Sequence, residues 1–148
     1  MRHFVAEFVG TFALVFVGSG AIIAAAAARM DSALIVVAFA HGLILAVMVS
    51  ATMRISGHFN PAVTVGFLAA RRIEPVMAGV YIAAQIVGAI LAAYALKMLL
   101  PDILTEPTRV GGLSIATETT AAQAIGLEAI ATFFLTFVIF GTAVDPKS

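Results

Sequence analysis

SGHFNPAVTVGFLAA, residues 56–70, is the stretch that decides the fold. Asn60 belongs to the residue types that cap helix starts, and Pro61 suits the first helical position because its missing N–H costs nothing there. A helix over residues 60–70 would be ~16 Å long, about half of the ~30 Å hydrocarbon core of a bilayer. The apolar segments on both sides of it are long enough to cross that core. The stretch therefore predicts a re-entrant half-helix that starts near the middle of the membrane.

The composition of the chain is that of an integral membrane protein. Hydrophobic residues make up 62% of its 148 residues and charged residues 11%, whereas soluble domains carry about 25% charged residues. The mean hydropathy is +1.11. The formal net charge is zero, which does not favour nucleic acid as a partner, and the lack of cysteine excludes thiolate metal sites. We find no metal-ligand cluster and no supported Ser/His/Asp set, so we expect neither an enzyme nor a cofactor.

Four segments contain the ~20 apolar residues that a membrane-spanning helix needs. They are residues 8–28, 32–53, 76–96 and 119–144. Only the last of them contains a charged residue, Glu128. The connection 99–118 contains two prolines and two glycines and therefore predicts an exposed loop.

The placement of lysine and arginine predicts the orientation of these spans. One side of the membrane receives Arg2, Arg54, Arg71, Arg72 and Lys147, and the other receives Arg29, Lys97 and Arg109. Because cytoplasmic segments carry the excess of basic residues, this balance predicts a cytoplasmic N-terminus.

An internal repeat relates the first span to the fourth. EFVGTFALVFVGSG (7–20) and EAIATFFLTFVIFG (128–141) are identical at seven of fourteen positions, and Glu7 aligns with Glu128. A charge within the membrane is costly, so a shared acid is harder to attribute to chance than shared apolar residues. A repeat unit of three spans places the second copy upside down, which predicts an inverted repeat with a site near the membrane midplane. Only the first helix of the second copy is present, so we expect a fragment of a longer chain.

The half-helix has a chemistry of its own. Non-helical backbone at mid-membrane is tolerated only inside protein or beside water, so residues 57–59 should line a wet passage. The helix start carries a partial positive charge, which repels cations and protons. The amide of Asn60 can donate hydrogen bonds, and the carbonyls of Gly57, His58 and Phe59 can accept them. This combination favours small uncharged solutes that form hydrogen bonds.

Several stretches resemble the aquaporin, or major intrinsic protein, family. ISGHFNPAVTVG is similar to its first Asn-Pro-Ala loop, and AEFVGTFALVFVGSGA, AFAHGL, YIAAQIVGAILAA and EAIATFFLTFVIFGTA resemble its first four spans in order. The resemblance implies an all-α membrane protein with four transmembrane helices and one re-entrant half-helix, a truncated form of a six-helix inverted-repeat fold, of prokaryotic type. It implies the first repeat at residues 1–98 with the half-helix at 60–70, an extracellular loop at 99–118, and the start of the second repeat at 119–148.

The resemblance also implies roles for individual residues. Asn60, Pro61 and Ala62 match the family signature, which implies that Asn60 faces the pore as a donor. His41 falls where the family places one member of its narrow filter; the alternative is a histidine that packs between helices. The expected pore and selectivity residues are Asn60, Pro61, Ala62, His41, Gly57, His58 and Phe59. The residues expected to support the re-entrant loops are Glu7, Glu128 and Gln85.

The leading expectation is a passive channel for water, and for other small neutral solutes, that excludes protons and ions. One alternative is a proton-coupled transporter that uses Glu7, His41 and Glu128. Another is a non-conducting half-channel or interaction protein, if the natural chain ends at Ser148. The resemblance implies a homotetramer when the chain is complete, and we expect a multi-pass protein of the plasma (inner) membrane.

Overall fold

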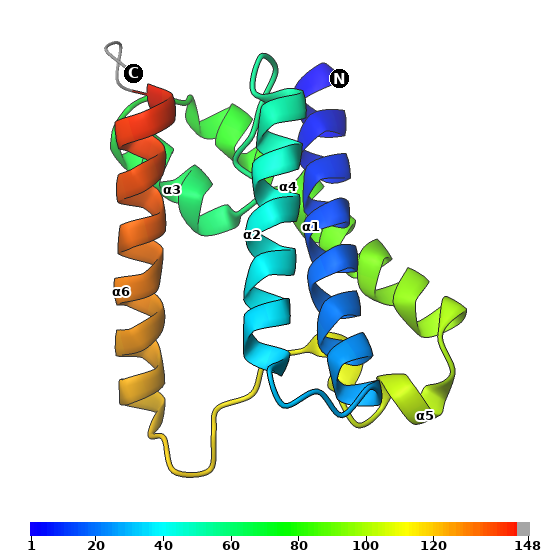
Figure 1. Ribbon diagram of the computed structural model, residues 1–148. Helices are drawn as coiled ribbons and strands as arrows, with labels where there is room; N and C mark the ends of the chain where they lie inside the picture. The colour runs from blue at the N-terminus through cyan, green and yellow to red at the C-terminus, as the bar shows by residue number, and fades with distance from the viewer. Residues whose placement is uncertain (145–148) are drawn as a thin grey trace.

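The computed structural model describes residues 1–144, and these residues form helices joined by loops, with no strand among them (Figure 1). The helices are α1 (Arg2–Ala27), α2 (Ala33–Thr52), α3 (Pro61–Ala69), α4 (Pro75–Leu99), α5 (Asp102–Thr105) and α6 (Ala121–Ile139), with a 3₁₀ turn η1 (Arg109–Gly111) and a π-helical turn η2 (Phe140–Val144). Lys147 and the last residues of the predicted segment 119–148 lie outside the described residues.

The predicted fold class is confirmed. The helices α1, α2, α4 and α6 are long and apolar enough to cross a membrane. The first span begins six residues before the position that we predicted, because the helix also includes residues 2–7, three of which (Arg2, His3 and Glu7) are polar. Helices α1 and α6 run in opposite directions (Figure 1), as the inverted repeat requires.

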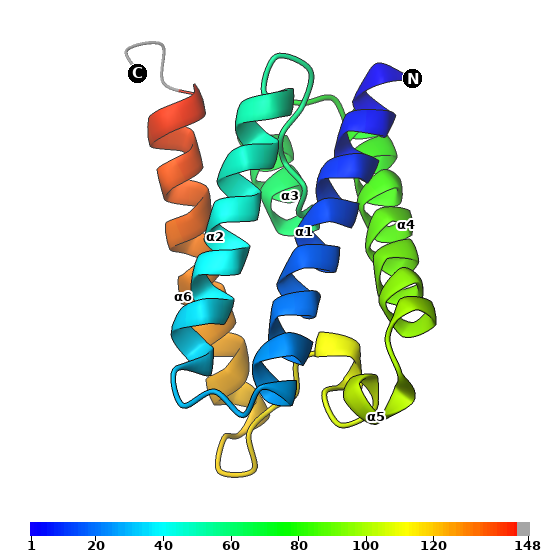
Figure 2. The ribbon, with the colours of Figure 1, turned by 45° about the vertical axis from the view of Figure 1, so that its right-hand side comes forward.

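The half-helix α3 begins as its sequence predicts. Asn60 is the N-cap, with extended backbone angles, and its side chain accepts a hydrogen bond from the backbone N–H of Ala62. Pro61 occupies the first helical turn, and the helix ends at Ala69 with Ala70 as its C-cap. Both views show α3 confined to the half of the bundle where α1 begins (Figure 2).

Small residues allow α1 and α4 to approach closely. Ala84 and Ala92 of α4 are fully buried. A Cβ atom added to Gly88 would lie 2.7 Å from the carbonyl oxygen of Phe8 and 3.2 Å from the backbone nitrogen of Phe12. Lipid supplies no hydrophobic force that would draw the helices together, so this contact depends on van der Waals packing between the two backbones.

The connection between α4 and α6 is not the fully exposed loop that we predicted for residues 99–118. Leu99 still belongs to α4, and α5 and η1 pack against α1. Thr105 is buried, and Gly111, with φ +77°, lies so close to Ser19 that a Cβ atom there would be 2.6 Å from the Ser19 Cβ. The glycine permits the close approach, which our reading of glycine and proline as markers of an exposed loop did not anticipate. Residues 112–118 are exposed, as predicted.

Helices α2 and α6 leave the region around α3 open on one side. Neither has a buried residue among those described. In the part of the chain that the structure describes, α6 packs against α3 and not against α1, α2 or α4. Figure 1 shows α3 between α2 and α6, and Pro61 and Ala62 in its first turn are exposed.

Candidate functional site

The centre of the site is the carboxylate of Glu7, which is fully buried on α1. Its Oε1 atom accepts hydrogen bonds from Ser56 Oγ and, at 2.9 Å, from the backbone N–H of His58. Its Oε2 atom accepts from the backbone N–H of Phe59 at 2.8 Å and from Gln85 Nε2 at 2.6 Å. An ionised carboxylate only accepts, and it has room for these four donors. One acid on α1 therefore binds both the re-entrant loop and α4.

Thr64, in the first turn of α3, is a second point of attachment. It is fully buried, and its Oγ1 atom accepts a hydrogen bond from Gln85 Nε2 at 3.0 Å. The same hydroxyl donates to the backbone carbonyl of Asn60 at 3.2 Å and lies 3.1 Å from His58 Nδ1. The imidazole of His58 packs against Phe67, with ring centroids 4.1 Å apart. The side chain of His58 thus braces the loop against α3.

Phe59 forms the turn at which the loop reverses into α3. Its φ is +49°, in the left-handed region that non-glycine residues seldom adopt. Its side chain is buried and occupies the space that a Cβ atom would take at Gly10 of α1. Gly10 is therefore required for the ring of Phe59 to lie against α1.

Asn60 presents donors at the start of α3. Its Oδ1 atom accepts from the backbone N–H of Ala62 at 2.7 Å, which leaves the Nδ2 group without a hydrogen-bond partner among residues 1–144. Pro61 and Ala62 are exposed beside it. The backbone carbonyls of residues 57–59 likewise accept no hydrogen bond from the described residues. In this loop, therefore, Glu7 binds the N–H groups of residues 58 and 59, whereas the carbonyl groups of residues 57–59 have no hydrogen-bond partner among the described residues.

His41 lies on α2 and is half-buried. Its Nδ1 atom is 2.8 Å from the carbonyl oxygen of Val37, and the tip of its ring lies against Gly18 of α1. The structure does not bring His41 into the network around Glu7.

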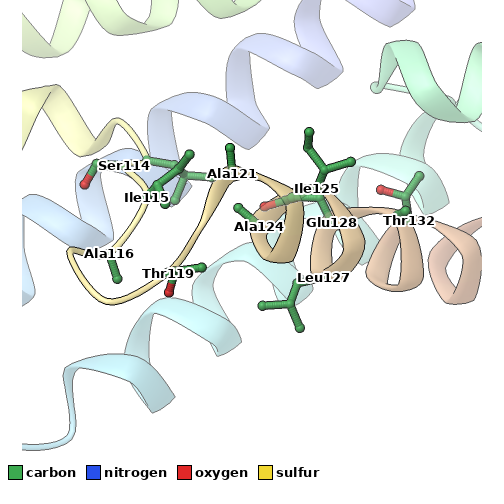
Figure 3. Close-up of a pocket in the computed structure, with 12 residues that line it drawn as sticks. Ser114, Ile115, Ala116, Thr119, Ala121, Ala124, Ile125, Leu127, Glu128 and Thr132 are labelled. Atoms are coloured by element: carbon green, nitrogen blue, oxygen red, sulfur yellow. The ribbon is translucent and has the colours of Figure 1, made fainter.

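Glu128, the repeat partner of Glu7, has different surroundings. It is exposed, and its carboxylate accepts no hydrogen bond from the residues that the structure describes. It lines a pocket of about 800 Å³ between the segment 113–119 and α6, together with Thr132 (Figure 3). No residue of the re-entrant loop borders this pocket, so the loop-supporting role of Glu128 stays a prediction.

Three contributors to the site escaped the sequence analysis: Ser56, Thr64 and Gly10. The two hydroxyl residues had a signal, because a polar side chain in an apolar membrane segment needs a hydrogen-bond partner. The sequence signal for Gly10 was weaker: it lies three residues after Glu7 on the same helix. Which loop residue fills the space beside it depends on a contact between positions 49 residues apart, and no local pattern contains that information.

Comparison with known proteins identifies the family. The family model described as "Major intrinsic protein" matches residues 1–148. The chain is 38% identical over 158 residues to "Probable aquaporin TIP3-2" of Arabidopsis thaliana, a match that covers 99% of this chain and 57% of the relative. It is 38% identical over 153 residues to "Probable aquaporin TIP-type alpha" of Phaseolus vulgaris, covering 99% and 58%. It is 37% identical over 148 residues to "Aquaporin NIP6-1" of Arabidopsis thaliana, covering 99% and 47%.

These relatives are longer than the present chain. The chain spans about half to three fifths of the length of the curated relatives that it matches. They are plant proteins, so they give no support to the expected prokaryotic type. The family match covers the whole chain, and the half-helix with its Asn60 cap and the four membrane-spanning helices agree with it. The chain belongs to the major intrinsic protein family.

Proposed function

We propose that the protein acts as a passive channel for water and other small neutral solutes, with the start of α3 as one half of its pore. The observation that carries this proposal is the asymmetry of the loop. Glu7 accepts the backbone N–H groups of His58 and Phe59, whereas the adjacent carbonyls and the Nδ2 group of Asn60 have no partner among the described residues. A neutral molecule that both donates and accepts hydrogen bonds can exchange its hydrogen bonds to water for hydrogen bonds to these carbonyl and amide groups.

The same geometry opposes the passage of cations. A helix start carries about half a positive charge, and α3 directs its start toward the interior of the bundle. A cation at that point would meet this charge and the Nδ2 donors of Asn60, and it would lose part of its hydration. Protons that move along a water chain meet the same barrier.

The alternative of a proton-coupled transporter is not favoured by any observation. Its three proposed groups are Glu7, His41 and Glu128. Within residues 1–144, no hydrogen bond links any two of them. Glu7 is surrounded by four donors, His41 is directed at the carbonyl of Val37, and Glu128 lies in a separate pocket. A relay would need a continuous path among them, so the channel is the better proposal.

Further proposals concern the assembly and the location. We infer from family membership that the protein is a homotetramer, with a counterpart of α3 that completes each pore from the rest of the protein. Cross-linking in native membranes should then trap a species of four times the monomer mass, and monomer alone would contradict it. We also propose a plasma (inner) membrane location with a cytoplasmic N-terminus; the orientation, and not the compartment, is supported by Arg2, Arg54, Arg71 and Arg72, which lie at one end of the bundle. An impermeant amine reagent should label Lys97 in intact cells but not the amino group of Met1.

Osmotic swelling of proteoliposomes that contain the full-length protein tests the function. We expect fast water flow without ion current. Asn60→Asp should lower water permeability and admit cations, because it removes the Nδ2 donors and adds a negative charge at the helix start. The new carboxylate can still accept from the N–H of Ala62, so α3 should keep its cap.

The matched control is Gln123→Glu, the same amide-to-acid change at the start of α6. Gln123 accepts hydrogen bonds there from Thr120, and a carboxylate accepts them equally well. It should leave both permeabilities unchanged. Unaltered water flow and no cation leak in Asn60→Asp would count against a pore-facing Asn60, and absence of water flow in the unaltered protein would reject the channel.

A further inference from the structure

The imidazole of His41 reaches across from α2 to α1. Its Nδ1 atom is 2.8 Å from the backbone carbonyl oxygen of Val37, one turn earlier on α2. Its far end lies in the space beside Gly18, where a Cβ atom would overlap with Nε2 and would lie 2.6 Å from Cδ2 and 2.8 Å from Cε1. The ring thus fills a notch on α1 that exists only because residue 18 has no side chain.

These contacts fix the form of the imidazole. A carbonyl oxygen only accepts, so Nδ1 carries the proton and Nε2, in the neutral ring, faces α1 without one. Which nitrogen of His41 carries the proton is therefore a reporter of whether the ring lies in the notch.

The notch lies at a different level from the start of α3. Gly10 contacts the ring of Phe59, next to Asn60, and Gly18 contacts His41. Eight residues separate the two glycines, so the His41 contact lies ~12 Å further along α1 than the level of Asn60. Gly10 and Gly18 of α1 thus contact the rings of Phe59 and His41 at two different depths in the bundle.

We propose that Gly18 is a positioning residue that holds the ring of His41 against α1 and thereby sets the width of the solute path at this second level. The inference rests on the proposed channel function. A side chain at position 18 would expel the ring from the notch, and the ring would turn toward the open side of the bundle. The passage would then be narrower, and the permeability to solutes wider than water would fall before the permeability to water.

The first experiment measures the ring directly. The full-length protein, labelled with ¹⁵N at histidine and reconstituted in lipid bilayers, is studied by solid-state nuclear magnetic resonance. We expect a His41 signal with protonated Nδ1 and bare Nε2 in the unaltered protein, and loss of that single form in Gly18→Ala. The matched control is Gly20→Ala on the same helix, whose new Cβ would meet only Leu96 Cδ2 at 3.7 Å, an ordinary contact.

The second experiment measures transport of water and, as a wider neutral probe, urea. In Gly18→Ala the ratio of urea to water permeability should fall by roughly tenfold, the low end of the discrimination that one methylene gives in a fitted site. Gly20→Ala should leave the ratio unchanged. The double variant Gly18→Ala/His41→Ala should behave like His41→Ala, because without the ring the added methyl group has nothing to displace.

The outcomes separate the inference from the function on which it rests. If the protein conducts but Gly18→Ala matches Gly20→Ala in both the His41 signal and the ratio, the inference is wrong. If the signal changes while the ratio does not, Gly18 holds the ring but does not set the width, which also overturns the proposal. If the unaltered protein conducts nothing, the channel function fails together with the claim about width, and the His41 signal alone decides whether Gly18 holds the ring.

Discussion

The substitution Glu7→Gln tests the interaction on which the site depends. The remaining oxygen can still accept two of the four hydrogen bonds that Glu7 receives, but the new N–H₂ group faces the other two donors. Gln85 can turn its amide, because its Oε1 atom is buried without a partner, whereas the backbone N–H of Phe59 has no such freedom. Between one and two buried donors stay unpaired, at ~1–3 kcal/mol each, so we expect the free energy of unfolding to fall by ~1–6 kcal/mol.

Two measurements check this expectation. Reversible unfolding in mixed detergent micelles gives the change in free energy, and amide hydrogen exchange gives the protection of the Phe59 N–H, which should be lost. The control Glu74→Gln removes the same charge from an exposed residue whose side chain forms no cap hydrogen bond, and it should change stability by less than ~0.5 kcal/mol. If Glu7→Gln is no more destabilising than this control and Phe59 exchange is unaltered, the carboxylate does not hold the loop.

Two further substitutions probe the packing around the site. Gly88→Ala should reduce the free energy of unfolding by ~1–3 kcal/mol, because its Cβ atom would lie 2.7 Å from the Phe8 carbonyl oxygen. Gly79→Ala on the same helix, which meets nothing within 4 Å, should have no such effect, and equal unfolding curves would contradict the close contact. Thr64→Val should cost ~1–3 kcal/mol, because Gln85 loses an acceptor; a change below ~0.5 kcal/mol in the same unfolding measurement would show that Thr64 is not a point of attachment.

The sequence predicted those parts of the fold that local chemistry determines. The four spans follow from runs of apolar residues, and the start of α3 follows from the capping ability of Asn60 and the fixed φ of Pro61. The repeat predicted that Glu7 and Glu128 are related, which agrees with the opposite directions of α1 and α6. Each of these signals lies within about twenty residues or in a direct alignment of two segments.

Contacts between distant segments could not be predicted in the same way. The left-handed turn at Phe59 depends on an acceptor on α1 and on the absence of a side chain at Gly10, neither of which is visible in residues 56–70. The packing of η1 against α1 depends on the contact of Gly111 with Ser19, which are far apart in the sequence. Glycine and proline mark where a helix ends, but they do not say which surface the following residues will contact.

The energy of the turn at Phe59 explains why position 7 carries an acid. A non-glycine residue in the left-handed region costs on the order of 1–3 kcal/mol. In water, burial of the ring would offset that cost, but lipid is as apolar as the protein interior, so within a bilayer only packing contacts remain. The hydrogen bond from the Phe59 N–H to a charged acceptor contributes ~1.5–3 kcal/mol, which matches the strain. A neutral acceptor would contribute ~0.5–1.5 kcal/mol, which offsets only the lower part of that range, so it would hold the turn, and with it Asn60, less firmly.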